Sequence, residues 1–416
     1  MSILIKQVLL GEQRLDVHIE DEHFTRIAPC VDIVADTVID GTPFAILPAF
    51  YNMHTHAPMT LLRSYADDIE LHTWLSEYIW PVEKKIREEH VYHGTRLAVL
   101  EMIKSGTVYF NDMYWLSLGA ARAAMEMGMR ADITLLLIDA GDPGKSDELL
   151  KSADDFFSHE AEYPDRIRFT YGPHAIYTVS EKTMRKCAER ARKEGRRIHI
   201  HISETQTEVE QAIKNFGKRP IEYLDSIGFL GPDVTAVHCI HLNDKERSIL
   251  RERGVVIAHC PTSNMKLSSG HFDYAAIRAS GIPLTLGTDG ASSNNSLSML
   301  SEMKFASLWA KACSTDPTTA PAQEIFDLAT VHGARAAGLN AGSVEEGMLA
   351  DCMLVRLEHP SLIPSGHLIS NMVYSATPEC IDTVICNGKI LMRDRVIPGE
   401  ADIIYAAQEA YRDLIK

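Results

Sequence analysis

The sequence predicts an α/β fold, a (β/α)8 TIM barrel with a small β-sandwich domain formed by both termini. Eight short runs rich in β-branched or aromatic residues recur through the middle of the chain, and amphipathic stretches separate them. The two ends of the chain instead show short strands and turns. Because parallel strands joined by right-handed helical crossovers can close into a ring, we expect the eight runs to form a barrel in chain order.

The predicted barrel strands follow one another between residues 44 and 290. They are FAILPAFYNMHTH (44–56), TVYFND (107–112), RADITLLLID (130–139), RIRFTYGPH (166–174), RRIHIHISE (196–204), VTAVHC (234–239), VVIAHC (255–260) and IPLTLGTDG (282–290). Several of the intervening helical segments end in Gly, as helix C-caps commonly do. An open nucleotide-binding sheet is the weaker alternative, since neither G-x-G-x-x-G nor a complete Walker loop occurs.

The ends of the chain are expected to form one small domain. Residues 1–48 and 343–416 make up this predicted β-sandwich, with the final residues helical, and residues 49–342 make up the barrel. The dipeptide Asn387-Gly388, between two apolar runs, predicts a hairpin there.

Composition excludes several classes of function. The 416 residues include 41 Lys and Arg against 57 Asp and Glu, a formal charge of −16, which argues against a nucleic-acid partner. No apolar stretch approaches the roughly 18 residues of a membrane span, and the N-terminus lacks a signal-cleavage pattern. The eight cysteines contain no C-x-x-C pair and indicate reduced thiols. We therefore expect a cytoplasmic protein that binds neither nucleic acid nor membranes and whose assembly into a homo-oligomer the sequence leaves open.

Nearly every predicted strand ends on a His, Asp or Glu. In a (β/α)8 barrel the carboxyl ends of the strands converge on one face, so residues far apart in sequence become neighbours there. This pattern indicates that the residues at the strand ends form one shared site. They are His54, His56, His174, His201, Glu204, His238, His259 and Asp289.

A divalent metal site is the strongest hypothesis for part of this group. His54 and His56 are separated by one residue, so both imidazoles lie on one face of an extended strand. Alone, the pair could be two ordinary histidines near a turn. Together with His201 and Asp289, it forms a nitrogen and oxygen ligand set with an open position, which is typical of catalytic metal sites.

Neighbouring residues at the strand ends receive other interpretations. Cys239 and Cys260 directly follow histidines, but strand alternation turns them to the opposite face, so we expect both to pack in the core. His199 shares a face with His201 but lies one pleat deeper, which predicts a packed histidine or one that contacts a ligand. H-E-x-x-H, G-x-S-x-G and the cytidine-deaminase motif are absent, which argues against those three chemistries.

Seven motifs spread along most of the chain carry a resemblance to a known family. They are NMHTHAPMTLLR (52–63), WPVEKKI (80–86), YGPHAIYT (171–178), HISET (201–205), HCIHL (238–242), HCPTSNMKL (259–267) and GTDGASSNNSLSML (287–300). With these motifs the sequence resembles the amidohydrolase superfamily and, within it, the 5′-methylthioadenosine/S-adenosylhomocysteine deaminases.

The resemblance implies a metal centre and a set of catalytic roles. It implies that His54, His56, His201 and Asp289 hold one divalent metal per subunit, expected to be Zn²⁺, with Fe²⁺ and Mn²⁺ as alternatives. Binuclear relatives use a carboxylated lysine that ends the fourth strand, and residues 166–174 contain no Lys. It further implies that Asp289 takes the proton of water, that Glu204 protonates ring N1 and returns a proton to the amine, and that His238 orients the water. The alternative for Glu204 is a carboxylate that interacts favourably with a helix N-terminus.

The same resemblance implies how a nucleoside would bind. His174 matches a residue that hydrogen-bonds the purine, and Glu83 matches one that holds the ribose hydroxyls. The alternatives are a strand-end histidine and a first-turn helix acid after Pro81. Aromatic residues could wall the nucleoside, although their spacing is equally typical of packing: Trp74, Tyr78 and Trp80.

The predicted function is therefore hydrolytic deamination, at the 6-amino group, of 5′-modified adenosines to the inosine analogue and ammonia. The candidate substrates are 5′-methylthioadenosine, 5′-deoxyadenosine, adenosine and S-adenosylhomocysteine. One alternative is hydrolysis of another aminated or chlorinated heteroaromatic ring, such as a pterin or a triazine, and a further one is an inactive barrel. Residues 129–146 offer only Arg130 and Lys145 as partners for a substrate carboxylate, which favours a small uncharged 5′ group.

Overall fold

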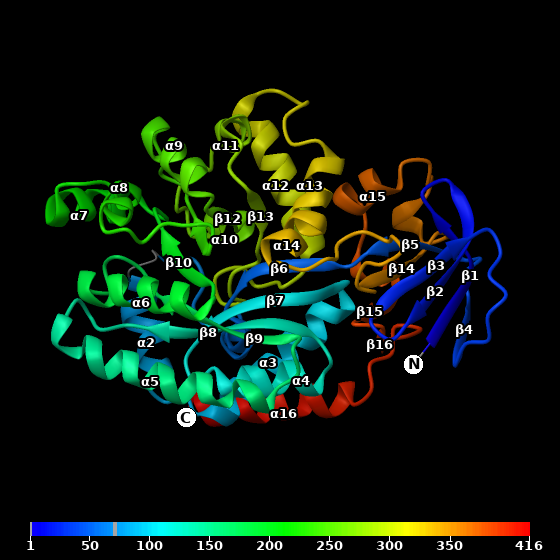
Figure 1. Cartoon of the computed structure of the whole chain (residues 1–416), viewed down its shortest axis with the longest axis horizontal. Coiled ribbons are helices and arrows are strands. Elements are labelled where there is room, and N and C mark those ends of the chain that lie inside the picture. The colour runs from blue at the N-terminus through cyan, green and yellow to red at the C-terminus, as the bar shows by residue number, and fades with distance from the viewer. Residues whose placement is uncertain (1, 70–72) are drawn as a thin grey trace.

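The computed structural model describes residues 2–69 and 73–416, in which two eight-stranded sheets form the framework (Figure 1). The first sheet is the predicted barrel, and its strands pair in parallel and in chain order. Just past the end of the last strand, Asp289 N donates to the O atom of His54 in the first strand at 3.0 Å, across the remaining seam. The strands are β6 (Phe50–Thr55), β7 (Thr107–Tyr114), β8 (Arg130–Leu137), β9 (Ile167–Pro173), β10 (Ile198–Ile202), β11 (Val234–His238), β12 (Val256–His259) and β13 (Leu284–Leu286).

Several helices around the barrel begin and end where the sequence supplies caps. Helix α6 (Glu181–Glu194) follows Ser180, whose hydroxyl accepts from Thr183 N, and it ends at Gly195 with φ 66°. Gly tolerates this left-handed conformation because it has no Cβ. The other helices around the barrel are α3 (Glu88–Lys104), α4 (Leu118–Glu126), α5 (Ser146–Ser158), α7 (Gln206–Phe216), α8 (Pro220–Ser226), α9 (Asp244–Arg253), α10 (Pro261–Lys266), α11 (Tyr274–Ser280), α12 (Met299–Ser314), α13 (Ala322–Ala329) and α14 (Val331–Ala336).

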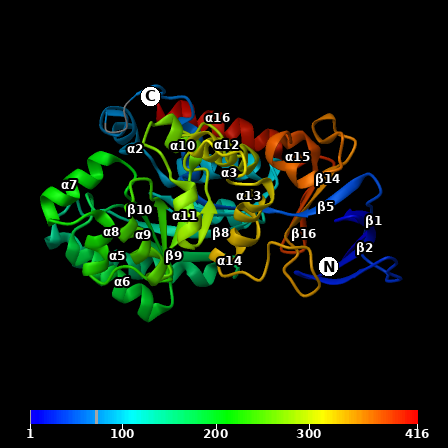
Figure 2. The ribbon, with the colours of Figure 1, turned by 90° about the horizontal axis from the view of Figure 1, so that it is seen from above.

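The second sheet combines both ends of the chain, as predicted, and lies at one side of the barrel in Figures 1 and 2. Its strand β1 pairs with β2 on one edge and with β4 and β5 on the other, so the sheet branches around its own apolar core. The predicted hairpin at Asn387-Gly388 joins β15 to β16. The strands are β1 (Ser2–Leu10), β2 (Gln13–Glu20), β3 (His23–Ala28), β4 (Thr37–Asp40), β5 (Phe44–Pro48), β14 (Cys352–Arg356), β15 (Ile381–Cys386) and β16 (Lys389–Met392).

The first predicted barrel strand, residues 44–56, is two strands in the structure. β5 pairs with β14 in the terminal sheet, whereas β6 pairs with β7 in the barrel. The division falls at Pro48, which has no N–H to donate, and Ala49 N then donates to Asp351 O at 3.2 Å. A continuous apolar run therefore passes from one sheet into the other.

Two helices that follow the barrel in sequence pack on its outside. α16 (Glu400–Leu414) lies against α3 (Figure 2). Lys104 Nζ is 2.7 Å from Glu400 Oε2, and Arg87 contacts Asp413. α15 (Leu368–Tyr374) lies against α12 and α13. By its contacts α16 is part of the helical layer of the barrel, although it follows the strands of the terminal sheet.

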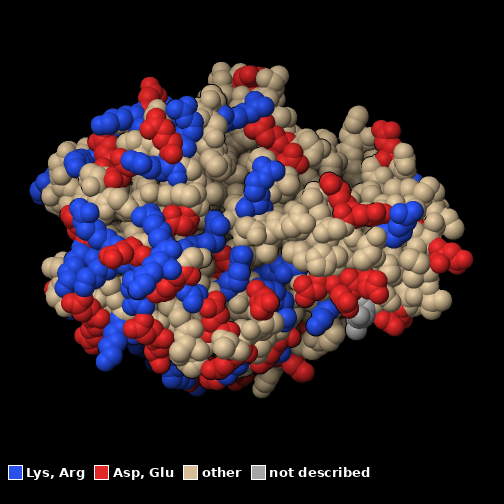
Figure 3. Space-filling model, viewed as in Figure 1, with Lys and Arg blue, Asp and Glu red and all other residues tan. Residues whose placement is uncertain are grey.

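Charged side chains on the face in Figure 3 are mixed in sign. Over α5 and α6, for example, Lys182 pairs with Asp147 at 3.0 Å, and Arg190 pairs with Asp154. Much of the positive charge of these helices is therefore held in ion pairs.

Of the helices in residues 2–69 and 73–416, none has the length and apolar character to span a membrane.

A buried ion pair joins the base of the barrel to the terminal sheet. Asp351 Oδ2 accepts from Arg130 Nε at 2.8 Å and from Tyr51 Oη at 2.7 Å, and Oδ1 accepts from Asn387 N at 2.7 Å. Both charged side chains are buried, so each compensates the desolvation of the other.

We expect Asp351→Ala to lower the free energy of unfolding by about 3–5 kcal/mol, because it leaves the Arg130 charge buried without its partner. Chemical denaturation measures this value. As a control, Lys245→Ala removes a surface ion pair with Glu222 and should have a much smaller effect on stability. Equal effects of the two substitutions would contradict the structural role of Asp351.

Candidate active site

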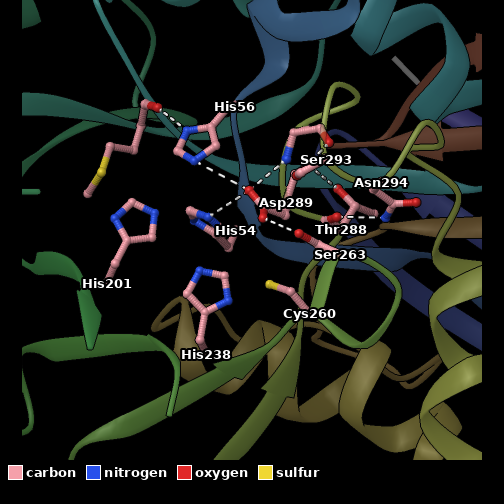
Figure 4. Close-up of polar contacts among 12 residues, drawn as sticks. His54, His56, His201, His238, Cys260, Ser263, Thr288, Asp289, Ser293 and Asn294 are labelled. Carbon is pink, nitrogen blue, oxygen red and sulfur yellow. Dashed lines mark hydrogen bonds and ion pairs between the residues drawn. The ribbon is translucent and has the colours of Figure 1, made fainter. Parts of the chain in front are cut away.

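Five potential metal donors meet at the carboxyl-terminal end of the barrel (Figure 4). Donor atoms of His54, His56 and Asp289 lie within 4.8 Å of one another, as do those of His54, His201 and His238. His54 Nε2 and His56 Nε2 are each 3.3 Å from Asp289 Oδ1. The four predicted ligands are thus brought together around His54, and His238 lies beside them.

Hydrogen bonds fix the orientation of the surrounding imidazoles. His201 Nδ1 donates to His174 O at 2.9 Å, and His56 Nδ1 donates to Met113 O. Because a carbonyl only accepts, the proton lies on Nδ1 and each Nε2 keeps a free lone pair. His238 Nδ1 likewise lies 2.9 Å from Asn264 Oδ1. This is the tautomer with which histidine binds a metal or accepts a proton through Nε2.

The chemistry of the donor set fits a divalent cation. His54 Nε2 is buried, and within the described residues it has no hydrogen-bond partner. Burial lowers the pKa of His54 to about 4, which keeps the imidazole neutral, as a ligand must be. A cation would satisfy both this nitrogen and the carboxylate beside it.

Asp289 is held by hydrogen bonds suited to a carboxylate. Ser263 Oγ donates to Oδ2 at 2.6 Å and Gly290 N donates to Oδ1 at 2.7 Å. Burial alone would raise the pKa of Asp289, but its interactions with the nearby imidazoles of His54, His56 and His238 hold it well below its ordinary value. Asp289 is therefore ionised and can act as a ligand or a base.

Three residues at these strand ends have positive φ angles. Ser203, His238 and Asp289 have φ values of 53°, 69° and 61°, in a region that non-glycine residues rarely adopt. Each such residue costs about 1–3 kcal/mol. The chain turns sharply there as it leaves the barrel, and the side chains of His238 and Asp289 line the site.

Glu204 lies between the metal donors and the outer part of the site. Its Oε1 accepts from Ser269 Oγ at 3.2 Å, and its Oε2 is 3.7 Å from His238 Nε2. Glu208 accepts from the backbone N–H groups of Ser203 and Glu204, both at 2.9 Å, and so fixes the backbone that carries Glu204. The motifs in the sequence do not include Glu208. Its position in the first turn of α7, three residues after the capping Thr205, is nevertheless typical of a glutamate that accepts from backbone N–H groups at the start of a helix.

A cavity that opens to solvent extends from the metal donors. Glu83 at the end of α2 (Trp80–Glu83) lines it and accepts from Trp115 Nε1 at 3.2 Å. Burial raises the pKa of Glu83, while hydrogen bonding with Tyr114 and Trp115 opposes that shift. The sequence analysis did not identify Trp115, which directly follows β7 and could have been found by its position at a strand end.

The structure brings most of the predicted site residues to this one cavity. The lining includes His56, Glu83, His174, His201, Glu204, His238 and Asp289, together with Trp74 and Trp80. His54 lies against Asp289 at the buried side of the donor group. His259 is separate and stacks on Phe272 with ring centroids 3.9 Å apart. Cys239 and Cys260 are buried, as predicted.

The fold and site define a (β/α)8-barrel protein with a metal-binding group at the carboxyl ends of its strands. The family model described as "Amidohydrolase family" matches residues 45–391, and the chain belongs to this family.

Curated relatives cover most of the chain. A protein of Archaeoglobus fulgidus named 5-methylthioadenosine/S-adenosylhomocysteine deaminase 1 is 45% identical over 91% of this chain and 89% of its own length. A 5′-deoxyadenosine deaminase of Methanospirillum hungatei is 45% identical over 92% of this chain and 85% of its own. A crystal structure of an adenosine deaminase from Xanthomonas campestris with bound zinc is 31% identical, with a TM-score of 0.93, and covers 99% of this chain and 98% of that one.

Proposed function

We propose that this chain is a metal-dependent hydrolase that removes the 6-amino group of 5′-modified adenosines and yields the inosine analogue and ammonia. One observation carries the proposal: a single cavity joins the metal donors and Glu204 to Glu83, a carboxylate able to accept hydrogen bonds from ribose. The curated relatives, which bear deaminase names, support the same reaction class.

The proposed metal ligands are His54, His56, His201 and Asp289, and the proposed metal is one Zn²⁺ per chain. The neutral imidazole of His54 and the ionised carboxylate of Asp289 support this set. When bound, such a metal supplies the activation of water as a nucleophile near neutral pH.

The side chains around the cavity supply the proton transfers. Water adds to C6 of the purine as the new C–O bond forms, and Asp289 accepts the proton that this water loses. Glu204 donates a proton to ring N1, takes up the proton of the added hydroxyl group as the C6=O bond forms, and passes that proton to the amino group. The C–N bond then breaks and neutral ammonia leaves, and the proton held by Asp289 returns to Glu204. His238, whose Nδ1 is engaged by Asn264, presents Nε2 to the water.

Two residues are proposed to hold the nucleoside. Glu83 accepts hydrogen bonds from the ribose hydroxyls, which its fixed contact with Trp115 supports. His174 hydrogen-bonds the purine ring; its Nδ1 is 2.9 Å from Thr178 Oγ1, which leaves Nε2 for the substrate. Trp74 and Trp80 contribute apolar walls.

Product analysis tests the proposal against the hydrolysis of another ring. Incubated with 5′-methylthioadenosine, the metal-loaded protein should release ammonia and the corresponding inosine analogue. An amino- or chlorotriazine incubated in parallel should be unchanged. Turnover of the triazine but not of the nucleoside would favour the alternative class, and no turnover of either would favour an inactive barrel.

The wall of the cavity next to β8 favours a small uncharged 5′ group. Leu136 and Ile138 line it, and within the described residues no Lys or Arg lines the cavity. Arg130 is at the opposite end of β8, paired with Asp351. Lys145 is exposed at the end of the 3-10 helix Pro143–Lys145. An amino-acid carboxylate in this cavity would be desolvated without a cationic partner.

We expect kcat/KM for 5′-methylthioadenosine, 5′-deoxyadenosine or adenosine to exceed that for S-adenosylhomocysteine by at least roughly tenfold, or about 1.4 kcal/mol. Steady-state kinetics on the four compounds measure this ratio. Equal or better efficiency with S-adenosylhomocysteine would show that a cation from another segment or another subunit reaches the substrate.

The proposed setting is the cytoplasm, with a small nucleoside as the partner. The eight cysteines are free thiols in the structure, which suits a reducing compartment.

A further inference from the structure

A buried histidine that the proposed mechanism does not use contacts one of the proposed metal ligands. His199 is in β10, two residues before His201, and its Nε2 is 2.8 Å from His54 Nδ1. The two ring planes differ by 20° and their centroids are 5.0 Å apart. At this separation the rings lie nearly in one plane, so the lone pair of one nitrogen faces the N–H of the other.

His54 differs from the other two proposed histidine ligands in the acceptor it uses. His56 and His201 direct Nδ1 to backbone carbonyl oxygens, of Met113 and His174 respectively. These backbone oxygens are present whatever side chains residues 113 and 174 carry. The acceptor for His54 is a side chain, so the orientation of this ligand depends on the identity of residue 199.

The direction of the hydrogen bond follows from metal binding. A ligand nitrogen must be unprotonated, so His54 can bind a metal through Nε2 only if its proton is on Nδ1. That proton then points at His199 Nε2, which must accept it. His199 correspondingly carries its own proton on Nδ1.

We propose that His199 is a positioning residue that accepts the Nδ1 proton of His54 and so holds His54 in the orientation and tautomer that bind the metal. This inference rests on the metal site of the proposed function. Removing a side chain that hydrogen-bonds a metal-bound histidine typically weakens metal binding by 10- to 100-fold.

The remaining nitrogen of His199 supports a role beyond packing. His199 is 1% exposed, and its Nδ1 has no hydrogen-bond partner within residues 2–69 and 73–416. A buried polar group without a partner is unfavourable, and an apolar side chain of similar size would avoid that cost. The hydrogen bond to His54 explains why an imidazole, and not an apolar side chain, occupies this buried position.

Metal affinity of three purified variants tests the proposal, with Zn²⁺ as the probe in competition with a chelator. His199→Leu removes the acceptor and should weaken Zn²⁺ binding by about 10- to 100-fold. His199→Gln can bring its amide oxygen close to the original Nε2 position and should remain within about threefold of the wild type. His259→Leu is the matched control, because His259 is also a buried strand-end histidine whose Nδ1 has no partner among the described residues. It lies outside the donor group and should bind Zn²⁺ as the wild type does.

Two outcomes would overturn the proposal. In one, His199→Leu binds Zn²⁺ as tightly as the wild type. In the other, His199→Gln loses as much affinity as His199→Leu, which would assign residue 199 a packing role.

A spectroscopic measurement on the wild type covers the case in which the variants do not fold. With ¹⁵N-labelled histidine and Zn²⁺ bound, His54 should carry its proton on Nδ1 and His199 should accept it through Nε2. A His54 proton on Nε2 would contradict the proposal. Neither measurement involves a nucleoside, so failure of the proposed deamination would leave this test intact.

Discussion

His201→Ala is expected to abolish most metal binding and most turnover together. The hydrogen bond from Nδ1 to His174 O holds the His201 imidazole in place, and alanine has no donor atom to replace it. We expect metal affinity to fall by at least about 100-fold and kcat/KM by at least about a thousandfold, or ~4 kcal/mol. Metal analysis of the dialysed protein and steady-state kinetics on 5′-methylthioadenosine measure both values. His56→Ala should give the same result.

A surface histidine provides the control for this prediction. His159 is on the outside of the barrel, 2.8 Å from Glu162, and His159→Ala should keep the metal and the rate of the wild type. A His201→Ala protein that retains its full metal content would remove His201 from the ligand set.

Glu204→Gln is expected to separate metal binding from catalysis. The amide keeps the shape of the carboxylate and can still accept from Ser269, but it cannot donate a proton to ring N1 or return one to the amine. We expect metal content to be unchanged and kcat to fall by about 10²- to 10⁴-fold. Metal analysis and single-turnover kinetics on the same preparation distinguish the two effects.

The matched control is Glu210→Gln, on the exposed side of the same helix that follows Glu204. It should leave both quantities at wild-type values. A Glu204→Gln enzyme with the wild-type rate would remove the proton-transfer role from the account, whereas loss of its metal would make Glu204 a ligand.

The barrel and its metal donors could be predicted from the sequence because the two depend on the same regularity. In a parallel barrel every strand runs in the same direction, so a histidine or acid that ends a strand must reach the common face. This reasoning places His54 and Asp289 in one site although they are far apart in the sequence, and in the structure His54 Nε2 is 3.3 Å from Asp289 Oδ1. It depends on strand direction alone and not on the path of any loop.

Contacts that depend on loops and on depth within the barrel could not be predicted in this way. The contact of Trp115 with Glu83 requires the loop after β7 and helix α2 to meet, and no periodic pattern encodes that meeting. The bond between His199 and His54 spans non-neighbouring strands inside the barrel. The apolar run at 44–56 could not reveal that it enters two sheets, because both environments are equally apolar.

Ammonia release from 5′-methylthioadenosine, measured as Zn²⁺ is added stepwise to metal-free protein, is the decisive experiment for metal-dependent deamination. We expect no release without metal, a linear rise as metal is added, and a plateau at one Zn²⁺ per chain. Full release in the absence of metal would contradict the proposed mechanism, as would a fully Zn²⁺-loaded protein that releases no ammonia from this nucleoside.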